Sequence, residues 1–72
     1  MDTTVIGARL KEIRLQKGMI QRDFAALFGM KRDAYARYEI NDSVPTVQGL
    51  YTMAKALGVS ADYILGLTDE KH

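Results

Sequence analysis

The sequence of 72 residues contains no cysteine, one proline and one histidine. Without cysteine, the chain can form neither a disulfide framework nor a thiolate metal site. The histidine is the terminal residue His72 and the carboxylates are scattered, so we expect no enzyme activity, no metal, no cofactor and no small-molecule ligand. No apolar run approaches the roughly 20 residues of a membrane span, and no secretory segment follows the acidic N-terminus. These absences predict a soluble, cytoplasmic protein without a membrane contact.

The length allows one domain and leaves no room for a second. Hydrophobic residues make up 47% of the sequence, which is enough for a small helical core. Apolar stripes with helical spacing recur along the chain, and glycines or the proline-containing segment 40–46 separate them. We therefore expect an all-α fold, a compact five-helix bundle over residues 1–72, with its core within residues 5–67 and a frayed tail at residues 68–72.

Residues 21–39 contain the pattern around which the rest of the chain is organised. A short apolar stripe with helical spacing ends at Gly29, where a helix commonly finishes in the left-handed conformation. A second short stripe follows directly. Helix, glycine turn and helix together predict a helix-turn-helix. The expected core residues are Phe24, Ala25 and Phe28 in the first helix, and Ala34, Tyr35 and Tyr38 in the second.

The outer face of the second helix has the chemistry needed to contact bases in a major groove. It carries Arg32, Asp33, Ala36 and Arg37. Arginine can bond guanine O6 and N7 together, so the two arginines predict guanines in the bound sequence. Asp33 has two candidate roles, accepting from a cytosine amino group or forming an i, i+4 ion pair that orients Arg37. We favour the ion pair, because an acid near phosphates is otherwise unfavourable; on periodicity alone, a merely solvated basic face stays an alternative.

Charge is distributed unevenly along the sequence, although the net charge is only +1. Residues 9–37 contain eight lysines and arginines against three acids, a balance of +5. Residues 38–72 contain two lysines against five acids, a balance of −3. This asymmetry is what a polyanion-binding face opposite an acidic back would produce.

Three further helices are predicted around the helix-turn-helix. The first spans about residues 5–17; another spans about residues 47–57 after the N-cap Thr46; the last begins after the N-cap Ser60. The apolar stripes of the first two predict these core residues: Ile6, Leu10 and Ile13, then Val47, Leu50, Ala54 and Leu57.

The last helix has more apolar surface than so short an element can easily bury. Tyr63, Ile64 and Leu67 are the residues concerned. Core burial and a homodimer contact explain them about equally well, so these residues are our candidates for a dimer interface.

Arg14 lies beside the apolar stripe of the first helix. An arginine in this position most often extends its charged end to solvent. It can instead pair with Glu39, at the end of the second helix of the helix-turn-helix, and still offer donors to a phosphate. Such a pair would tie the first helix to the base-contacting helix, and removing one partner would leave a partly buried charge.

Several segments match one known family at its own spacing without a gap, and they extend over residues 6–67. These are IGARLKEIR at 6–14, Gly18, Gln21, Phe24 and Ala25, Gly29, RYE at 37–39, Pro45, and AKALGVSADYILGL at 54–67. With five helices in this order, the sequence resembles the lambda-repressor and Cro-like helix-turn-helix family, also called the XRE family.

The resemblance implies a bacterial or phage transcriptional regulator, a repressor that binds a palindromic double-stranded DNA operator as a homodimer. The helix that begins near Arg32 would enter the major groove, and half-sites would lie about 34 Å apart. The family pattern assigns Gln21 to a phosphate and to the base-contacting helix, and Arg14 and Glu39 to a salt bridge. The residues expected to contact phosphates are Arg14, Gln21, Lys31, Asn41 and Ser43.

The sequence departs from the family at three places. The N-cap positions of the helix-turn-helix hold Ile20 and Lys31, whose side chains cannot accept the free amide hydrogens, a loss of about 1 kcal/mol each. Lys31 also places a positive charge at a positive helix end, which a bound phosphate would offset. Asp42 brings a negative charge to a loop that would face DNA, which argues against tight binding by a monomer. These departures keep open an alternative, an antitoxin-like protein-interaction module of the same fold.

Overall fold

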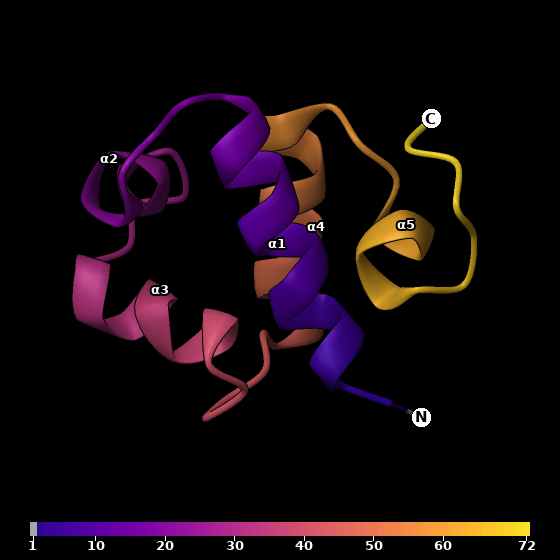
Figure 1. Cartoon of the computed structure of the whole chain (residues 1–72), viewed down its shortest axis with the longest axis horizontal. Helices are drawn as coiled ribbons and strands as arrows, with labels where there is room; N and C mark the ends of the chain where they lie inside the picture. The colour runs from indigo at the N-terminus through magenta and orange to yellow at the C-terminus, as the bar shows by residue number, and fades with distance from the viewer. Residues whose placement is uncertain (1) are drawn as a thin grey trace.

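The computed structural model describes residues 2–72, and within them the chain forms five helices and no strand (Figure 1). The prediction of an all-α bundle with a helix-turn-helix is confirmed. No helix in the described part is long and apolar enough to cross a bilayer. The helices are α1 (Thr4–Gln16), α2 (Gln21–Ala26), α3 (Arg32–Glu39), α4 (Val47–Leu57) and α5 (Ala61–Leu65).

The central element is α1, which separates the helix-turn-helix from α5 (Figure 1). In this view α2 and α3 lie on one side of α1, α5 lies on the other, and α4 lies behind it. The termini of α4 and α5 follow from local chemistry. Thr46 Oγ1 accepts from the Gly49 amide at 3.0 Å, and Ser60 Oγ accepts from the Tyr63 amide at 3.0 Å. These are the predicted N-caps, and each satisfies one amide that the helix itself cannot.

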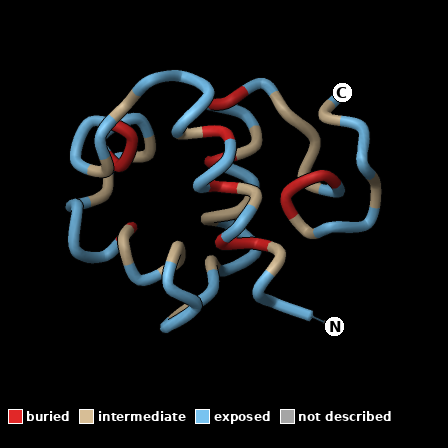
Figure 2. Tube along the Cα trace, in the orientation of Figure 1, coloured by how far each residue is buried: buried red, intermediate tan, exposed pale blue. Residues whose placement is uncertain are grey.

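The core is assembled from all five helices around the inner face of α1 (Figure 2). All three predicted core residues of α1 are buried, and none of them is more than 5% exposed. Burying a side chain of this size contributes about 1.5–3 kcal/mol. The buried hydrophobic residues are Ile6, Leu10, Ile13, Phe24, Ala25, Tyr35, Met53, Leu57, Tyr63 and Ile64.

Two expected core residues lie at the surface instead. Val47 is 88% exposed, and Met53 occupies the inner face of α4 with Leu57. Val47 has the helical spacing of a core residue, but it lies in the first turn of α4, where no other part of the chain covers it. Ala34 is also exposed, because its neighbour Tyr35 points directly into the core and adjacent helical residues face different directions.

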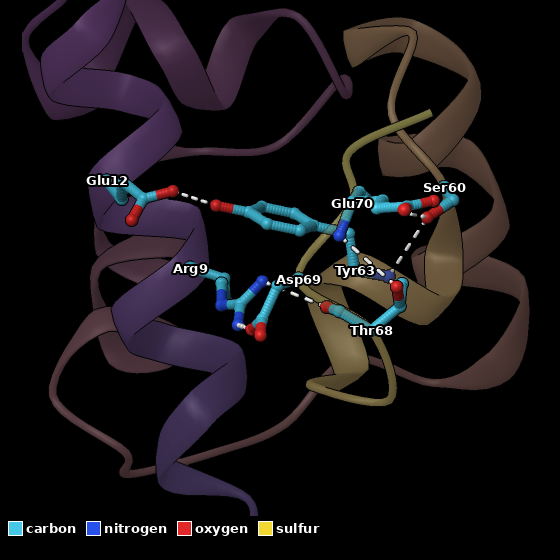
Figure 3. A network of polar contacts seen from close by, with 7 residues as sticks. All are labelled: Arg9, Glu12, Ser60, Tyr63, Thr68, Asp69 and Glu70. Atoms are coloured by element: carbon cyan, nitrogen blue, oxygen red, sulfur yellow. Dashed lines mark hydrogen bonds and ion pairs between the residues drawn. The ribbon is translucent and has the colours of Figure 1, made fainter.

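Residues 68–72, which we expect to be a frayed tail, contact α1 and the start of α5 in this structure (Figure 3). The Arg9 guanidinium donates to the Thr68 carbonyl at 3.2 Å and pairs with Asp69 at 2.9 Å. The Ser60 amide donates to the Lys71 carbonyl at 2.6 Å. Sequence patterns could not reveal these contacts, because they join residues up to 60 positions apart.

Tyr63 and Ile64 are buried within the single chain, 4% and 0% exposed, so they cannot form a dimer surface. The Tyr63 hydroxyl donates to Glu12, and the Arg9 guanidinium lies 4.0 Å from the centre of the ring (Figure 3). The hydrogen bond to Glu12 and burial raise the pKa of Tyr63. Of our three dimer candidates only Leu67 is exposed, at 72%.

Candidate nucleic-acid interface

The turn between α2 and α3 is fixed by backbone hydrogen bonds and by aromatic packing. Gly29 has a φ of +69°, and the amides of Gly29 and Met30 donate to the Ala26 and Ala25 carbonyls at 3.2 and 3.0 Å. These two bonds define a Schellman motif, which glycine adopts without steric cost. The Phe24 ring lies edge-on to the Tyr35 ring, with the centroids 5.2 Å apart. The angle of α3 relative to α2 is therefore set by the core.

The exposed face of α3 carries most of the predicted base-contacting residues. The side chains of Arg32, Asp33 and Arg37 are 55%, 85% and 59% exposed. Of the two alanines of α3, Ala36 was predicted to be on the exposed face but is half-buried, and Ala34 was predicted to be in the core but is exposed. A helix with two exposed arginines along one face can present guanidinium groups to base edges in a major groove.

A buried carboxylate anchors the end of α3 to α1. Glu39 accepts from Arg14 Nε at 2.7 Å and from Arg14 Nη2 at 3.0 Å, so the pair that the sequence allows is formed, with bidentate geometry. It also accepts from Gln21 Nε2 at 3.1 Å and from the Tyr35 hydroxyl. The Glu39 and Arg14 side chains are only 4% and 12% exposed. Four donors therefore satisfy one buried carboxylate, as the cost of burying a charge requires.

The same contacts shift the pKa values of the buried groups. Burial by itself raises the pKa of Glu39, but the hydrogen bonds from Arg14, Tyr35 and Gln21 outweigh it and hold that pKa below its ordinary value. Burial, and then the neighbouring carboxylate, raise the pKa of Tyr35 far above its usual range. Glu39 is consequently an anion and Tyr35 a neutral donor at neutral pH.

Gln21 connects this buried group to the exposed face. Its amide nitrogen donates to Glu39, and its Oε1 accepts from Arg32 Nη1 at 3.3 Å. The side chain thus bonds to α3 at both ends, the contact to the base-contacting helix that the resemblance implies. Arg14 has less to offer DNA, because its Nη1 also donates to the Met19 carbonyl at 3.0 Å and little of its surface is exposed.

The acid that pairs with Arg37 differs from the one expected. Arg37 Nε donates to Asp42 at 2.8 Å, whereas Asp33 pairs with Arg32. The i, i+4 pair fails to form because the chain turns back after α3 and brings Asp42 close. Asn41 makes this turn with a φ of +63°, the left-handed region that asparagine tolerates. The charge of Asp42 is therefore matched within the protein.

The other predicted phosphate contacts lie around the two ends of α3. Lys31 is exposed at the N-cap and makes no side-chain cap, so the first amides of α3 stay free, as expected for this residue. Free amides at a helix N-terminus favour an anion. Asn41 is exposed and Ser43 half-buried beyond the other end of α3.

Gly7 positions α3 and was not singled out from the sequence. A Cβ at this position would lie 2.3 Å from the Tyr38 carbonyl oxygen and 2.9 Å from Asn41 Oδ1. Only glycine lets α1 approach the end of α3 so closely. The available signal was a glycine inside a helix, which is unfavourable by about 0.5–1 kcal/mol and usually has a packing reason.

A family model described as helix-turn-helix matches residues 10–64 of this chain. The chain belongs to this family, the XRE-type helix-turn-helix proteins. It is 38% identical over 61 residues to YonR, a prophage-derived HTH-type transcriptional regulator of Bacillus subtilis, covering 85% of this chain and 56% of that protein. It is 33% identical over 66 residues to y4dJ, an HTH-type transcriptional regulator of Sinorhizobium fredii, covering 92% of this chain and 86% of that protein.

The fold is also similar to that of a hypothetical transcription factor, NHTF, from Neisseria. The TM-score is 0.80 with 27% sequence identity, covering 88% of this chain and 72% of that one. The chain spans about half the length of the three Bacillus subtilis relatives that it matches, between 54% and 56%.

Proposed function

We propose that this chain is a DNA-binding transcriptional regulator that inserts α3 into the major groove of an operator. The observation that carries the proposal is that one short helix, α3, exposes Arg32 and Arg37 and is anchored to α1 through the buried Glu39. A rigid helix that presents two guanidinium groups has the geometry for direct contact with guanine edges. Lys31 and the free amides of α3 would contact phosphates, which position the protein without specifying sequence. The relatives are HTH-type transcriptional regulators of bacteria, one of them prophage-derived, and they support a bacterial or phage regulator.

The finer proposal is a repressor that binds a palindrome as a homodimer. Because Tyr63 and Ile64 are buried, the dimer needs another surface, and exposed Val44, Val47 and Tyr51 provide one. They are 49%, 88% and 60% exposed, and the last two share a face at the start of α4. A dimer of this kind would read half-sites about 34 Å apart, one turn of the duplex. Val47→Asp should shift the protein from dimer to monomer in sedimentation, and an unchanged mass would place the interface elsewhere.

The proposed function is tested by selecting bound sequences from a random duplex library. The wild type should enrich a palindrome that contains guanine, and Arg32→Ala and Arg37→Ala should each relax the preference at one position per half-site. Each good arginine–guanine pair gives roughly 1–3 kcal/mol of discrimination. Arg22→Ala removes the same charge from a 73% exposed site on α2, and it should leave the enriched motif unchanged.

Failure of the wild type to enrich a motif would overturn the sequence-specific proposal. The antitoxin-like interaction module would then lead, with the apolar surface of Val44, Val47 and Tyr51 as its contact. Salt separates the two, because DNA binding loses about 0.9 log units of affinity per log unit of salt for each neutralised phosphate. An apolar protein contact has no such dependence.

A further inference from the structure

The two exposed arginines of α3 are held in different ways. Arg32 donates from both terminal nitrogens, from Nη1 to Gln21 and from Nη2 to Asp33. Arg37 donates from Nε to Asp42, and within residues 2–72 its terminal nitrogens form no hydrogen bond. A guanidinium has five N–H donors, so four of those of Arg37 are left for a ligand. The carboxylate of Asp42 thus orients Arg37 without occupying the end that would meet a base.

The backbone fixes Asp42 in this place. The Asp42 amide donates to the Arg37 carbonyl at 2.9 Å, and the Asn41 amide donates to the Tyr38 carbonyl at 3.2 Å. With Asn41 left-handed, these bonds form a Schellman motif at the end of α3. Asp42 therefore lies beside Arg37 because of how the helix ends.

A guanine edge and a phosphate differ in what Asp42 does to them. The guanine edge is neutral and accepts two hydrogen bonds, which Arg37 can supply from its terminal nitrogens while Nε keeps its bond to Asp42. A phosphate is an anion, and the nearby carboxylate repels it. The same acid therefore permits one contact of Arg37 and opposes the other.

We propose that Asp42 is a specificity-determining residue, which positions Arg37 for a guanine edge and disfavours a contact between Arg37 and the phosphate backbone. The inference rests on the proposed function, since it concerns the same DNA-binding face. It assigns a role to a loop acid whose charge would otherwise only weaken binding.

The test compares Asp42→Ala with the wild type on two duplexes, the selected sequence and a scrambled sequence of the same composition. The variant should bind the scrambled duplex more tightly while gaining less on the selected one, so the affinity ratio should fall on the order of fivefold. For the scrambled duplex, the slope of log affinity against log salt should steepen by about 0.9, because Arg37 is released to one more phosphate.

Asp23→Ala is the matched control. Asp23 is an exposed acid on α2, and its removal changes the net charge equally. It should tighten binding to both duplexes alike and leave their ratio unchanged. In an Arg37→Ala background, Asp42→Ala should likewise lose its differential effect. A fall in the ratio that persists without Arg37 would overturn the inference.

The ion pair also has a signature in the free protein. The side-chain Nε–H resonance of Arg37 should move in Asp42→Ala and stay in place in Asp23→Ala, and no movement in Asp42→Ala would contradict the pairing. If the wild type enriches no motif at all, the proposed function fails and this inference with it. If a motif is enriched but its ratio is the same in Asp42→Ala, the inference alone fails.

Discussion

Two arginines of α1 fasten opposite sides of the molecule, and their ion pairs differ in almost every physical respect. Arg14 pairs with Glu39 on the α3 side, where the side chains are 12% and 4% exposed. Arg9 pairs with Asp69 in the C-terminal tail, where they are 18% and 98% exposed. The first carboxylate accepts from three residues inside the protein, whereas the second lies in solvent. The end of α3, on the face proposed to bind DNA, is therefore held by a buried ion pair, whereas the ion pair of the tail lies mostly in solvent.

Breaking the buried pair should have the largest effect. Glu39→Gln leaves the Arg14 charge without a partner, and we expect a loss of about 3 kcal/mol in the free energy of unfolding, measured by urea denaturation at pH 7. The double variant Arg14→Met/Glu39→Leu should lose less free energy of unfolding, because it leaves no buried charge without a partner. A loss from Glu39→Gln below the roughly 0.5 kcal/mol of a surface substitution would contradict the role of the pair.

The same residue should make stability depend on pH. The pKa of Glu39 is lower in the folded than in the unfolded state, because its hydrogen bonds outweigh burial. The folded state therefore favours the charged form, and this contribution is present above the unfolded pKa of about 4.3 and lost as pH falls through the folded pKa. Wild-type stability should decline below about pH 5, and Glu39→Gln should show a shallower decline. Equal slopes for both proteins would place the acid sensitivity elsewhere.

Gly7→Ala should have the second-largest effect. The added Cβ would meet the Tyr38 carbonyl at 2.3 Å, so α1 and the end of α3 must separate. Forcing a methyl into a closed contact costs about 2 kcal/mol, measurable as a lower urea midpoint. Alanine normally stabilises a helix relative to glycine by about 0.5–1 kcal/mol. A gain of that size would show that the close approach is not required.

Lys31→Ser should have a smaller effect, with opposite signs for stability and binding. A serine N-cap can accept a free amide of α3, which should stabilise the fold by about 1 kcal/mol. Loss of the charge should weaken DNA binding and reduce the salt slope by about 0.9, if Lys31 neutralises one phosphate. Unchanged affinity and slope would remove Lys31 from the phosphate contacts.

Asp69→Ala should have the smallest effect. An ion pair with one partner in solvent contributes little, so the melting temperature should stay within experimental scatter. Affinity for DNA should also be unchanged, because the tail lies across α1 from α3 (Figure 1). A loss comparable to that of Glu39→Gln would mean that the tail is an integral part of the fold.

Local features of the sequence were enough to predict much of the fold. The α1 stripe and the caps Thr46 and Ser60 depend on residues within one or two turns, and periodicity or capping chemistry predicts them. Val47 shows the limit of this reasoning, since periodicity cannot tell where the bundle ends. Tyr63 shows another, because its burial depends on Glu12 and Arg9, far away in the sequence.

The sequence was enough to predict which residue types form the candidate site, but only some of the ion pairs between them. The position of Glu39 at the end of α3 pointed to Arg14, and the structure contains that pair. The predicted partner of Arg37, Asp33, was wrong. The left-handed turn at Asn41 brings Asp42 to Arg37, and such a turn has no strong sequence signature when the residue is not glycine. The left-handed conformation of Asn41 thereby decides which acid pairs with Arg37, the arginine proposed to contact a base.

The central claim, that α3 lies in the major groove and contacts guanine, is tested most directly by methylation protection of the selected duplex. Dimethyl sulfate modifies guanine N7 in the major groove, the atom that Arg32 and Arg37 are proposed to bond. The account predicts protected guanines in each half-site, with one position becoming reactive again in Arg37→Ala. Full reactivity of every guanine in a saturated wild-type complex would contradict it.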